Sequence, residues 1–165
     1  MFAIGDYIVY GTTGVCKVEA IGRLQKDGFP ADVEYYTLAP SYVKGSTIYA
    51  RVEGTKVLMR PVMTRSEIDQ LIAEIEAIEP LVVTDEKKRE EIYREVLKSG
   101  DLRKIISAIK LLCKRKEERL LQGKKVTASD DKYFKLAEDS LLGELAIVLG
   151  MDKASVREYL NHFMK

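Results

Sequence analysis

The chain has 165 residues, 46% of them hydrophobic and 32% charged, with 27 basic side chains against 26 acidic ones. This length and apolar content fit one ordinary domain or two small ones with a packed core, and every apolar run is shorter than the roughly 20 residues of a membrane span. One histidine and two distant cysteines leave almost no material for a zinc site or a Ser-His-Asp triad.

The N-terminal segment lacks the basic region and apolar stretch of a secretory signal, so we expect a cytoplasmic protein with no membrane contact.

Up to residue 63, β-favouring runs alternate with Gly, Pro, Asp and Ser turns, and six of the nine tyrosines precede residue 50. The runs cover residues 7–10, 15–18, 34–38 and 47–50, with hairpin connections at 11–14 and 26–28. About five strands at this spacing predict a small antiparallel β-barrel of the Tudor or SH3 kind, a fold that serves mainly as a binding module.

Residues 64–165 are predicted to form a helical domain, with a loop at residues 122–125. A capping box from Thr64 to Glu67 opens a connecting helix over residues 64–79, which ends before Pro80. Further capping residues, followed by apolar i, i+3, i+4 spacing, predict helices that begin after Asp85, Asp101, Thr127 and Asp152. The predicted fold class is therefore α+β, a barrel over 1–63 and then an all-α bundle of about four to five helices, most of it within 85–165.

Basic side chains are concentrated in residues 85–125, which hold fourteen basic and eight acidic residues, net +6. Such a segment points to a polyanionic partner, or else to a solvated helical surface with i,i+4 pairs. Opposite the apolar face of the third helix, basic residues form a stripe that suits phosphates rather than base readout. The stripe and its extensions comprise Arg103, Ser107, Lys110, Lys114, Arg115, Lys116, Arg119, Lys124 and Lys125, and a second cluster comprises Lys87, Lys88 and Arg89.

The last two helices have helix-turn-helix spacing through Ala146, Gly150 and Val156, but any tight helical hairpin would use the same residues. The final helix offers few side chains that could read bases, so we favour the plain hairpin.

Cys16 and Cys113 are predicted to be small buried hydrophobes. The sequence has no glycine-rich phosphate loop, and we expect no catalytic activity, cofactor, metal or small-molecule substrate.

Segments in both halves match one known pattern. The first half contains Met1-Phe-x-Ile-Gly-Asp-x-x-Val-Tyr, Gly14-Val15, Val18-Glu19-Ala20-Ile21, Tyr35-Tyr36-x-Leu38 and Met59-Arg60. The second half contains Ser99-Gly100-Asp101-Leu102, Lys114-Arg115-x-x-Glu118-Arg119 and Leu142-Gly143-Glu144-Leu145-Ala146. In this order they resemble the CarD/CdnL family of bacterial transcription regulators, whose N-terminal domain is similar to the RNA polymerase-interacting domain of transcription-repair coupling factor.

The resemblance implies that the barrel docks on the RNA polymerase β subunit. It also implies that the helical domain contacts promoter DNA at the upstream edge of the transcription bubble and stabilises the open complex. The polymerase-facing residues would then be Arg23, Leu24, Tyr49 and Arg51, and the DNA-facing ones Lys88, Arg89, Lys114 and Arg115. Together with the basic stripe, the predicted DNA-binding set is Lys87, Lys88, Arg89, Lys110, Lys114, Arg115, Arg119, Lys124 and Lys125.

The chain departs from the family pattern in three places. The tryptophan that wedges against DNA in the family corresponds to about Glu86, and this chain has no tryptophan. The usual Val-Pro of the fourth strand reads Ala50-Arg51, and the loop from Leu120 to Val126 is longer. Two alternatives therefore stay open: an adaptor that binds polymerase without touching DNA, and an autonomous helix-turn-helix repressor.

Overall fold

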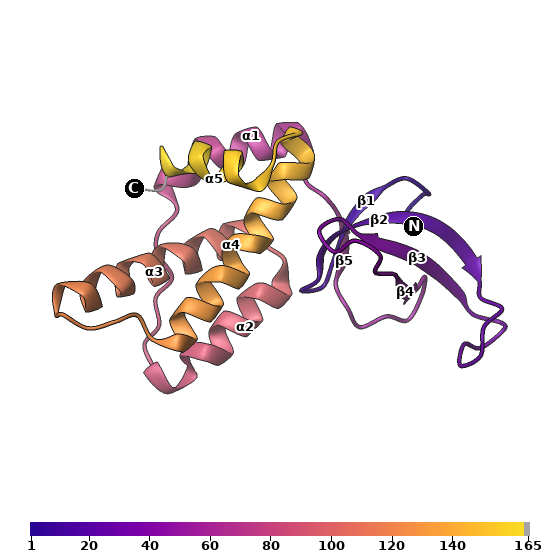
Figure 1. Cartoon of the computed structure of the whole chain (residues 1–165), viewed down its shortest axis with the longest axis horizontal. Coiled ribbons are helices and arrows are strands. Elements are labelled where there is room, and N and C mark those ends of the chain that lie inside the picture. Colours follow the sequence, from indigo (N-terminus) through magenta and orange to yellow (C-terminus); the bar gives the residue numbers. More distant parts are fainter. Residues whose placement is uncertain (164–165) are drawn as a thin grey trace. The chain divides into compact units, whose positions relative to one another are not determined.

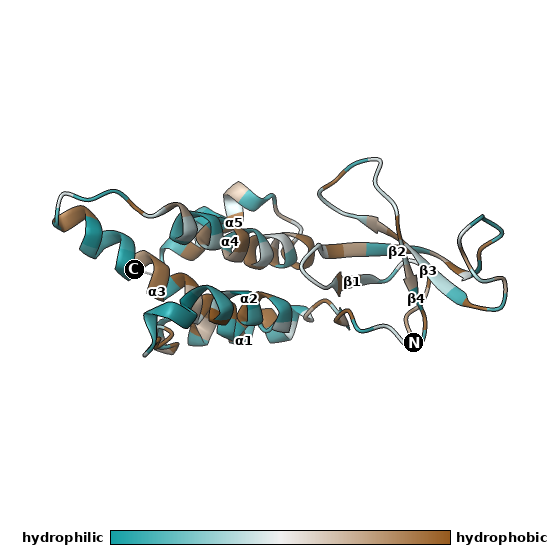
Figure 2. Cartoon of the chain, turned by 90° about the horizontal axis from the view of Figure 1, so that it is seen from below, coloured by the Kyte–Doolittle hydropathy of each residue, from teal (hydrophilic) through white to brown (hydrophobic). Residues whose placement is uncertain are grey.

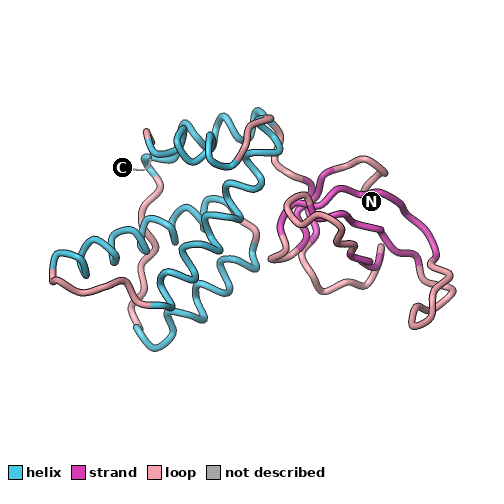
Figure 3. Tube along the Cα trace, in the orientation of Figure 1, coloured by secondary structure: helices cyan, strands magenta, loops and turns pink. Residues whose placement is uncertain are grey.

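A computed structural model describes residues 1–163 (Figure 1). The chain divides into two compact units, Met1–Val62 and a second that begins at Met63. All strands lie in the first unit and all helices in the second, as the colours of Figure 3 show, so the predicted α+β class is confirmed. Within the described residues, no helix combines the length and the apolar character needed to cross a membrane.

The first unit is one five-stranded antiparallel sheet. Its strand order is β4-β3-β2-β1-β5, and the bounds are β1 Tyr7–Tyr10, β2 Gly14–Arg23, β3 Glu34–Pro40, β4 Ile48–Arg51 and β5 Met59–Pro61. The edge strands β4 and β5 do not pair with each other in the part of the chain described here, so the sheet is barrel-like but not closed. Alternate side chains face one apolar core, namely Ile8, Cys16, Val18, Tyr36, Leu38 and Ala50.

The β1–β2 hairpin turns at Gly11-Thr-Thr-Gly14, as the sequence predicts. Both glycines have positive φ, +48° at Gly11 and +96° at Gly14, which favours glycine. A Cβ atom at Gly11 would also lie 2.8 Å from the Cγ1 atom of Val57. This turn therefore lets the segment that leads to β5 approach the hairpin closely.

Up to residue 163, the second unit consists of five α-helices and two short 3-10 helices. Their bounds are α1 Arg65–Glu74, η1 Ile75–Ala77, η2 Glu86–Lys88, α2 Arg89–Ser99, α3 Leu102–Leu121, α4 Ala128–Leu149 and α5 Lys153–Asn161. Hydrophilic and hydrophobic residues are interspersed along these helices (Figure 2), and the middle of α4 is buried all round, from Leu141 to Ala146. Apolar side chains form a main core that includes Ile68, Leu71, Ile105, Leu141, Leu145 and Val156. Tyr93, Leu112 and Tyr133 form a second, smaller cluster.

Side-chain caps fix most of the helix starts. Thr64 and Glu67 form the predicted capping box, and Asp101, Thr127 and Asp152 cap α3, α4 and α5. Asp85 instead caps η2, and the regular helix α2 begins only at Arg89. Between α4 and α5, Gly150 adopts the left-handed conformation of a helix end, which makes the predicted hairpin.

The boundary between the two units falls between Val62 and Met63, and each of these residues is hydrogen-bonded within its own unit. The backbone N–H of Val62 donates to the carbonyl of Tyr7 in the sheet, at 3.3 Å. The next N–H, that of Met63, donates to the Oε2 atom of Glu144 in α4, at 2.8 Å. Glu144 is buried, with 1% of its surface exposed, so this hydrogen bond fixes the start of the helical unit from inside its core.

The two cysteines differ in their surroundings. Cys16 is fully buried in the barrel core, and this burial raises the pKa of its thiol to about 11. Cys113 is exposed on α3, so its predicted burial is wrong. It lines a pocket together with Ile109 of α3 and Phe134 and Glu138 of α4.

Thiol modification should therefore separate the two cysteines. At pH 7.5 we expect iodoacetamide to alkylate Cys113 slowly in the native protein, because partial burial and the charge of Glu117 raise the pKa of this thiol. Cys16 should stay unmodified until the barrel unfolds, because its thiol is inaccessible. Intact-mass analysis should show one alkyl group added to the native protein and two added to the denatured protein. Rapid double alkylation of the native protein would mean that the barrel opens readily.

Candidate functional site

Three of the four predicted polymerase-facing residues lie in strands near one end of the sheet, namely Arg23, Tyr49 and Arg51. Arg23 pairs with Glu34, while Arg51 pairs with Tyr35, the next residue of β3. Because successive residues of a strand point to opposite faces, Arg23 lies on one face of the sheet and Arg51 on the other. Tyr49 shares the face of Arg51, and Leu24 follows the last residue of β2.

The face that carries Tyr49 and Arg51 is built around aromatic side chains. The ring of Phe29, from the β2–β3 connection, lies 5.3 Å from the rings of both Tyr35 and Tyr49. The ammonium group of Lys26 sits 4.7 Å above the Tyr49 ring and hydrogen-bonds its hydroxyl group. Sequence analysis missed Phe29 and Lys26, because it treated their segment only as a turn.

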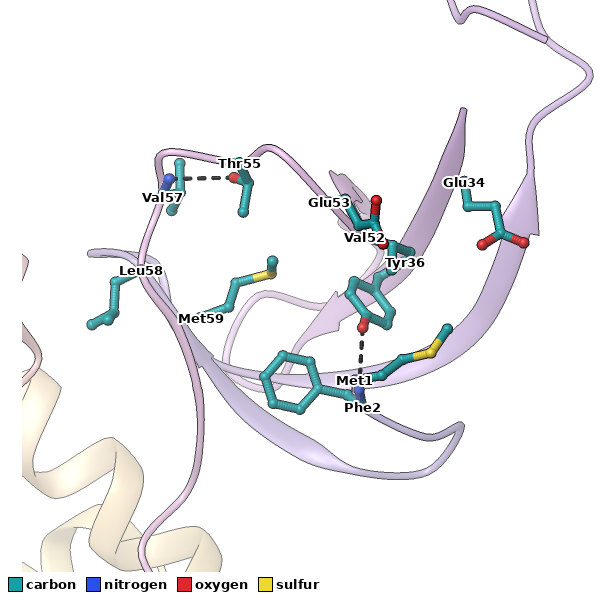
Figure 4. A pocket seen from close by; sticks show the side chains of 10 residues that line it. All are labelled: Met1, Phe2, Glu34, Tyr36, Val52, Glu53, Thr55, Val57, Leu58 and Met59. Carbon is teal, nitrogen blue, oxygen red and sulfur yellow. Dashed lines mark hydrogen bonds between the residues drawn. The ribbon is translucent and has the colours of Figure 1, made fainter. Parts of the chain in front are cut away.

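The barrel also holds a pocket of about 580 Å³, lined by the N-terminal segment, β3 and the β4–β5 connection (Figure 4). The hydroxyl group of Tyr36 accepts a hydrogen bond of 3.1 Å from the backbone N–H of Phe2, and the two rings are 5.6 Å apart. Glu34 and Glu53 supply carboxylates to an otherwise largely apolar lining. The first residues of the chain are thus part of the barrel.

The first half of the basic stripe on α3 binds other parts of the helical unit. The Nζ atom of Lys110 donates to the carbonyls of Ile75 and Ile78, both at 2.6 Å. Ser107 donates its hydroxyl to the carbonyl of Glu79, and Arg103 forms an ion pair with Glu74. The segment after α1 therefore crosses this face of α3, which the sequence analysis had treated as exposed.

A second group of basic residues surrounds one buried carboxylate. Asp130, in the first turn of α4, has 2% of its side chain exposed. The Nε atom of Arg115 lies 2.9 Å from its Oδ2 atom, and the Nε atom of Arg89 lies 3.3 Å from its Oδ1 atom. These contacts join the start of α2, the middle of α3 and the start of α4.

Glu86 contacts the same two arginines from the solvent side. Its Oε2 atom is 3.0 Å from Nη1 of Arg89, and its Oε1 atom is 3.2 Å from Nη1 of Arg115. The hydrogen bond from Arg89 and the positive charge of Arg115 lower the pKa of the Glu86 carboxyl group, so it stays ionised at neutral pH. Two carboxylates therefore balance the two guanidinium charges.

The other predicted DNA-facing residues lie on the surface. Lys87 and Lys88 are exposed in η2, Lys114 is exposed on α3, and Lys124 and Lys125 are exposed in the loop after α3. Arg119 is half-buried and donates from Nε to the carbonyl of Lys125 at 2.7 Å, which shapes this loop. The exposed lysines are the members of the predicted set that present their charge to solvent.

Two further residues bear on DNA binding by this region, Tyr93 and Asp130. Tyr93 is the aromatic residue of α2 nearest to Glu86, but it is buried, with 2% exposed, against Tyr133. It is therefore unsuited to replace the missing tryptophan. Asp130 was missed as a functional residue, because the sequence identifies it only as part of a helix cap. Within residues 1–163, no cluster of His, Cys, Asp and Glu could hold a metal ion.

Comparison with known proteins identifies both units. Residues 2–63 match the family model described as the CarD-like/TRCF RID domain, and residues 70–161 match the CarD C-terminal domain. The chain belongs to the CarD family and is thus a transcription-associated protein that interacts with RNA polymerase. It is 25% identical over 162 residues to a Bacillus subtilis (strain 168) protein named "Putative transcription factor YdeB", covering 96% of this chain and 99% of that protein.

Proposed function

We propose that the barrel docks on the β subunit of RNA polymerase and that the helical unit holds promoter DNA by phosphate contacts, so that the protein modulates the stability of the open complex. The observation that carries the first part is the edge strand β4, which presents Tyr49 and Arg51 on one face beside Phe29. An unpaired strand edge with an aromatic residue and an arginine suits a protein partner.

The second part of the proposal depends on the exposed lysines. Lys87, Lys88, Lys114, Lys124 and Lys125 come from η2, α3 and the loop that follows α3. Lysines bind the phosphate backbone, and without neighbouring side chains that hydrogen-bond the base edges they give affinity but little sequence preference. The α4–α5 hairpin supports an autonomous repressor less well, because α5, Lys153–Asn161, offers few side chains that could read bases.

A second candidate function is that of an adaptor that binds polymerase without DNA. One observation favours it: Glu86 and Asp130 neutralise two of the arginines that the family resemblance assigns to DNA. A mobility-shift experiment with promoter DNA, with and without polymerase, separates the adaptor, the polymerase-bound regulator and the autonomous repressor.

For the polymerase interface, we expect Arg51→Glu to weaken binding of the full chain to the isolated β lobe by about 1–3 kcal/mol, because a desolvated contact would be replaced by a repelling charge. Lys44→Glu is the matched control, since it makes the same charge change in an exposed loop of the barrel. Calorimetry measures both affinities. Equal affinities for wild type and Arg51→Glu would remove Arg51 from the interface.

For DNA, we expect weak binding that depends strongly on salt and little on sequence. Each neutralised phosphate should contribute about −0.9 to the slope of log K against log salt concentration. Fluorescence anisotropy with promoter and scrambled duplexes measures this slope and the sequence preference. A flat salt dependence, or a clear preference for the promoter duplex, would contradict phosphate contacts as the main interaction.

A further inference from the structure

The arrangement around Asp130 is that of a prepared anion site. Arg89 and Arg115 have only 17% and 21% of their side chains exposed. The Nε atom of Arg115 donates a hydrogen bond to Asp130, whereas the Nε atom of Arg89 lies at ion-pair distance, 3.3 Å, from the other carboxylate oxygen without a hydrogen bond. In both arginines the Nη1 atom is left to contact Glu86. Both Nη1 atoms then converge on one acceptor group, the carboxylate of Glu86.

The geometry resembles the way in which arginines bind phosphate. Two guanidinium groups that meet on one oxyanion give the charge-assisted, forked hydrogen bonding that suits carboxylate and phosphate alike. Glu86 itself is the most accessible member of the cluster, with 63% of its side chain exposed, and it belongs to a 3-10 helix of three residues. Its carboxylate can leave without disturbing the buried Asp130 contacts.

We propose that Arg89 and Arg115 form a phosphate-binding site that the Glu86 carboxylate occupies in the free protein and that a phosphate group displaces it. The DNA-backbone origin of that phosphate rests on the proposed function, whereas the site itself does not. Asp130 acts as a positioning residue, since it hydrogen-bonds the guanidinium group of Arg115 and attracts that of Arg89. Glu86 then acts as an intramolecular competitor that weakens DNA binding.

The neighbouring lysines support this choice of ligand. Lys87 and Lys88 follow Glu86 directly, and Lys114 precedes Arg115, so exposed positive charge flanks the site on two elements. Displacement of Glu86 would leave two guanidinium charges against the single charge of Asp130. A phosphate would restore the balance that Glu86 now provides.

The test compares wild type, Glu86→Gln, Glu86→Ala and the control Glu91→Gln, which removes an exposed carboxylate from the same region of the full chain. Inorganic phosphate is titrated while the arginine Nε–Hε signals are followed by NMR, and a DNA duplex is titrated by anisotropy. We expect both Glu86 variants to bind phosphate and DNA about three- to tenfold more tightly than wild type, and Glu91→Gln less than about twofold. The slope of log K against log salt should change by less than about one, because the same phosphates are contacted once Glu86 has been displaced or removed.

The outcomes distinguish the site from the wider function. Tighter phosphate binding with shifts at Arg89 and Arg115 but no DNA binding would support the site and contradict the proposed DNA contact. No gain for phosphate in either Glu86 variant would overturn the site. An equal gain in Glu91→Gln would also overturn it, since net charge alone would then explain the effect. Circular dichroism of each variant checks that the helical unit is folded.

Discussion

Replacing Asp130 with alanine is expected to lower the free energy of unfolding of the helical unit by about 3–5 kcal/mol, because it leaves two largely buried arginines without their carboxylate. Asp130 has 2% of its side chain exposed and contacts guanidinium groups from α2 and α3. The loss would therefore weaken the contacts between three helices at once. Denaturant unfolding followed by far-ultraviolet circular dichroism measures this free energy.

The neighbouring aspartate provides the control. Asp131 lies in the same first turn of α4 but forms an exposed i,i+4 ion pair with Lys135, so Asp131→Ala should cost no more than about 1 kcal/mol. The triple variant Arg89→Met, Asp130→Leu, Arg115→Met should be closer to wild type than Asp130→Ala, because no buried charge is left uncompensated and the Glu86 carboxylate is exposed to solvent. Similar stabilities of Asp130→Ala and Asp131→Ala would show that the buried ion pairs contribute little.

Glu86→Trp is expected to lengthen the half-life of the open promoter complex by about tenfold, since an indole stacked on a base contributes about 1–3 kcal/mol. This expectation depends on the proposed placement of the helical unit at the edge of the bubble. The half-life is measured after a competitor challenge at a responsive promoter. No change with Glu86→Trp would mean that position 86 does not reach the bubble.

Two comparisons identify the cause of such a gain. Glu86→Gln removes the charge without adding a ring, so the difference between the two variants isolates stacking. Adding Lys88→Glu and Lys114→Glu to Glu86→Trp should cancel the gain, because both lysines are exposed and available for phosphates. Arg115→Glu is unsuitable for this purpose, since it would remove the hydrogen-bonding partner of the buried Asp130 and place a second carboxylate beside it.

The elements that the sequence predicted well are those with local signals. Caps such as Thr64 and Asp101 act within three residues, and apolar spacing identifies each buried helix face without reference to the rest of the chain. The strand β5 has three residues, Met59–Pro61, and no β-favouring run, so it depends on its pairing with β1. Such a strand is defined by its partner rather than by its own residues.

The candidate site was harder to predict because its contacts are distant in sequence. A helical wheel places Lys110 and Arg115 opposite the apolar face of α3, but the segment after α1 covers Lys110, and Asp130 and Glu86 bind Arg115. Neither partner follows from the spacing within α3. The basic residues were therefore identified correctly by type, while their use inside the fold required the three-dimensional structure.

The hydrogen bond between Met63 and Glu144 has a practical consequence for dividing the chain. A barrel fragment that ends at residue 63, where the family match ends, takes Met63 away from the helical unit and its buried carboxylate. A cut after Val62 keeps the hydrogen bond from the Val62 N–H to the Tyr7 carbonyl in the barrel fragment, and the second fragment then begins at Met63. That fragment can be expressed from its own methionine as initiator, and its terminal ammonium group would then face the negative charge of Glu144.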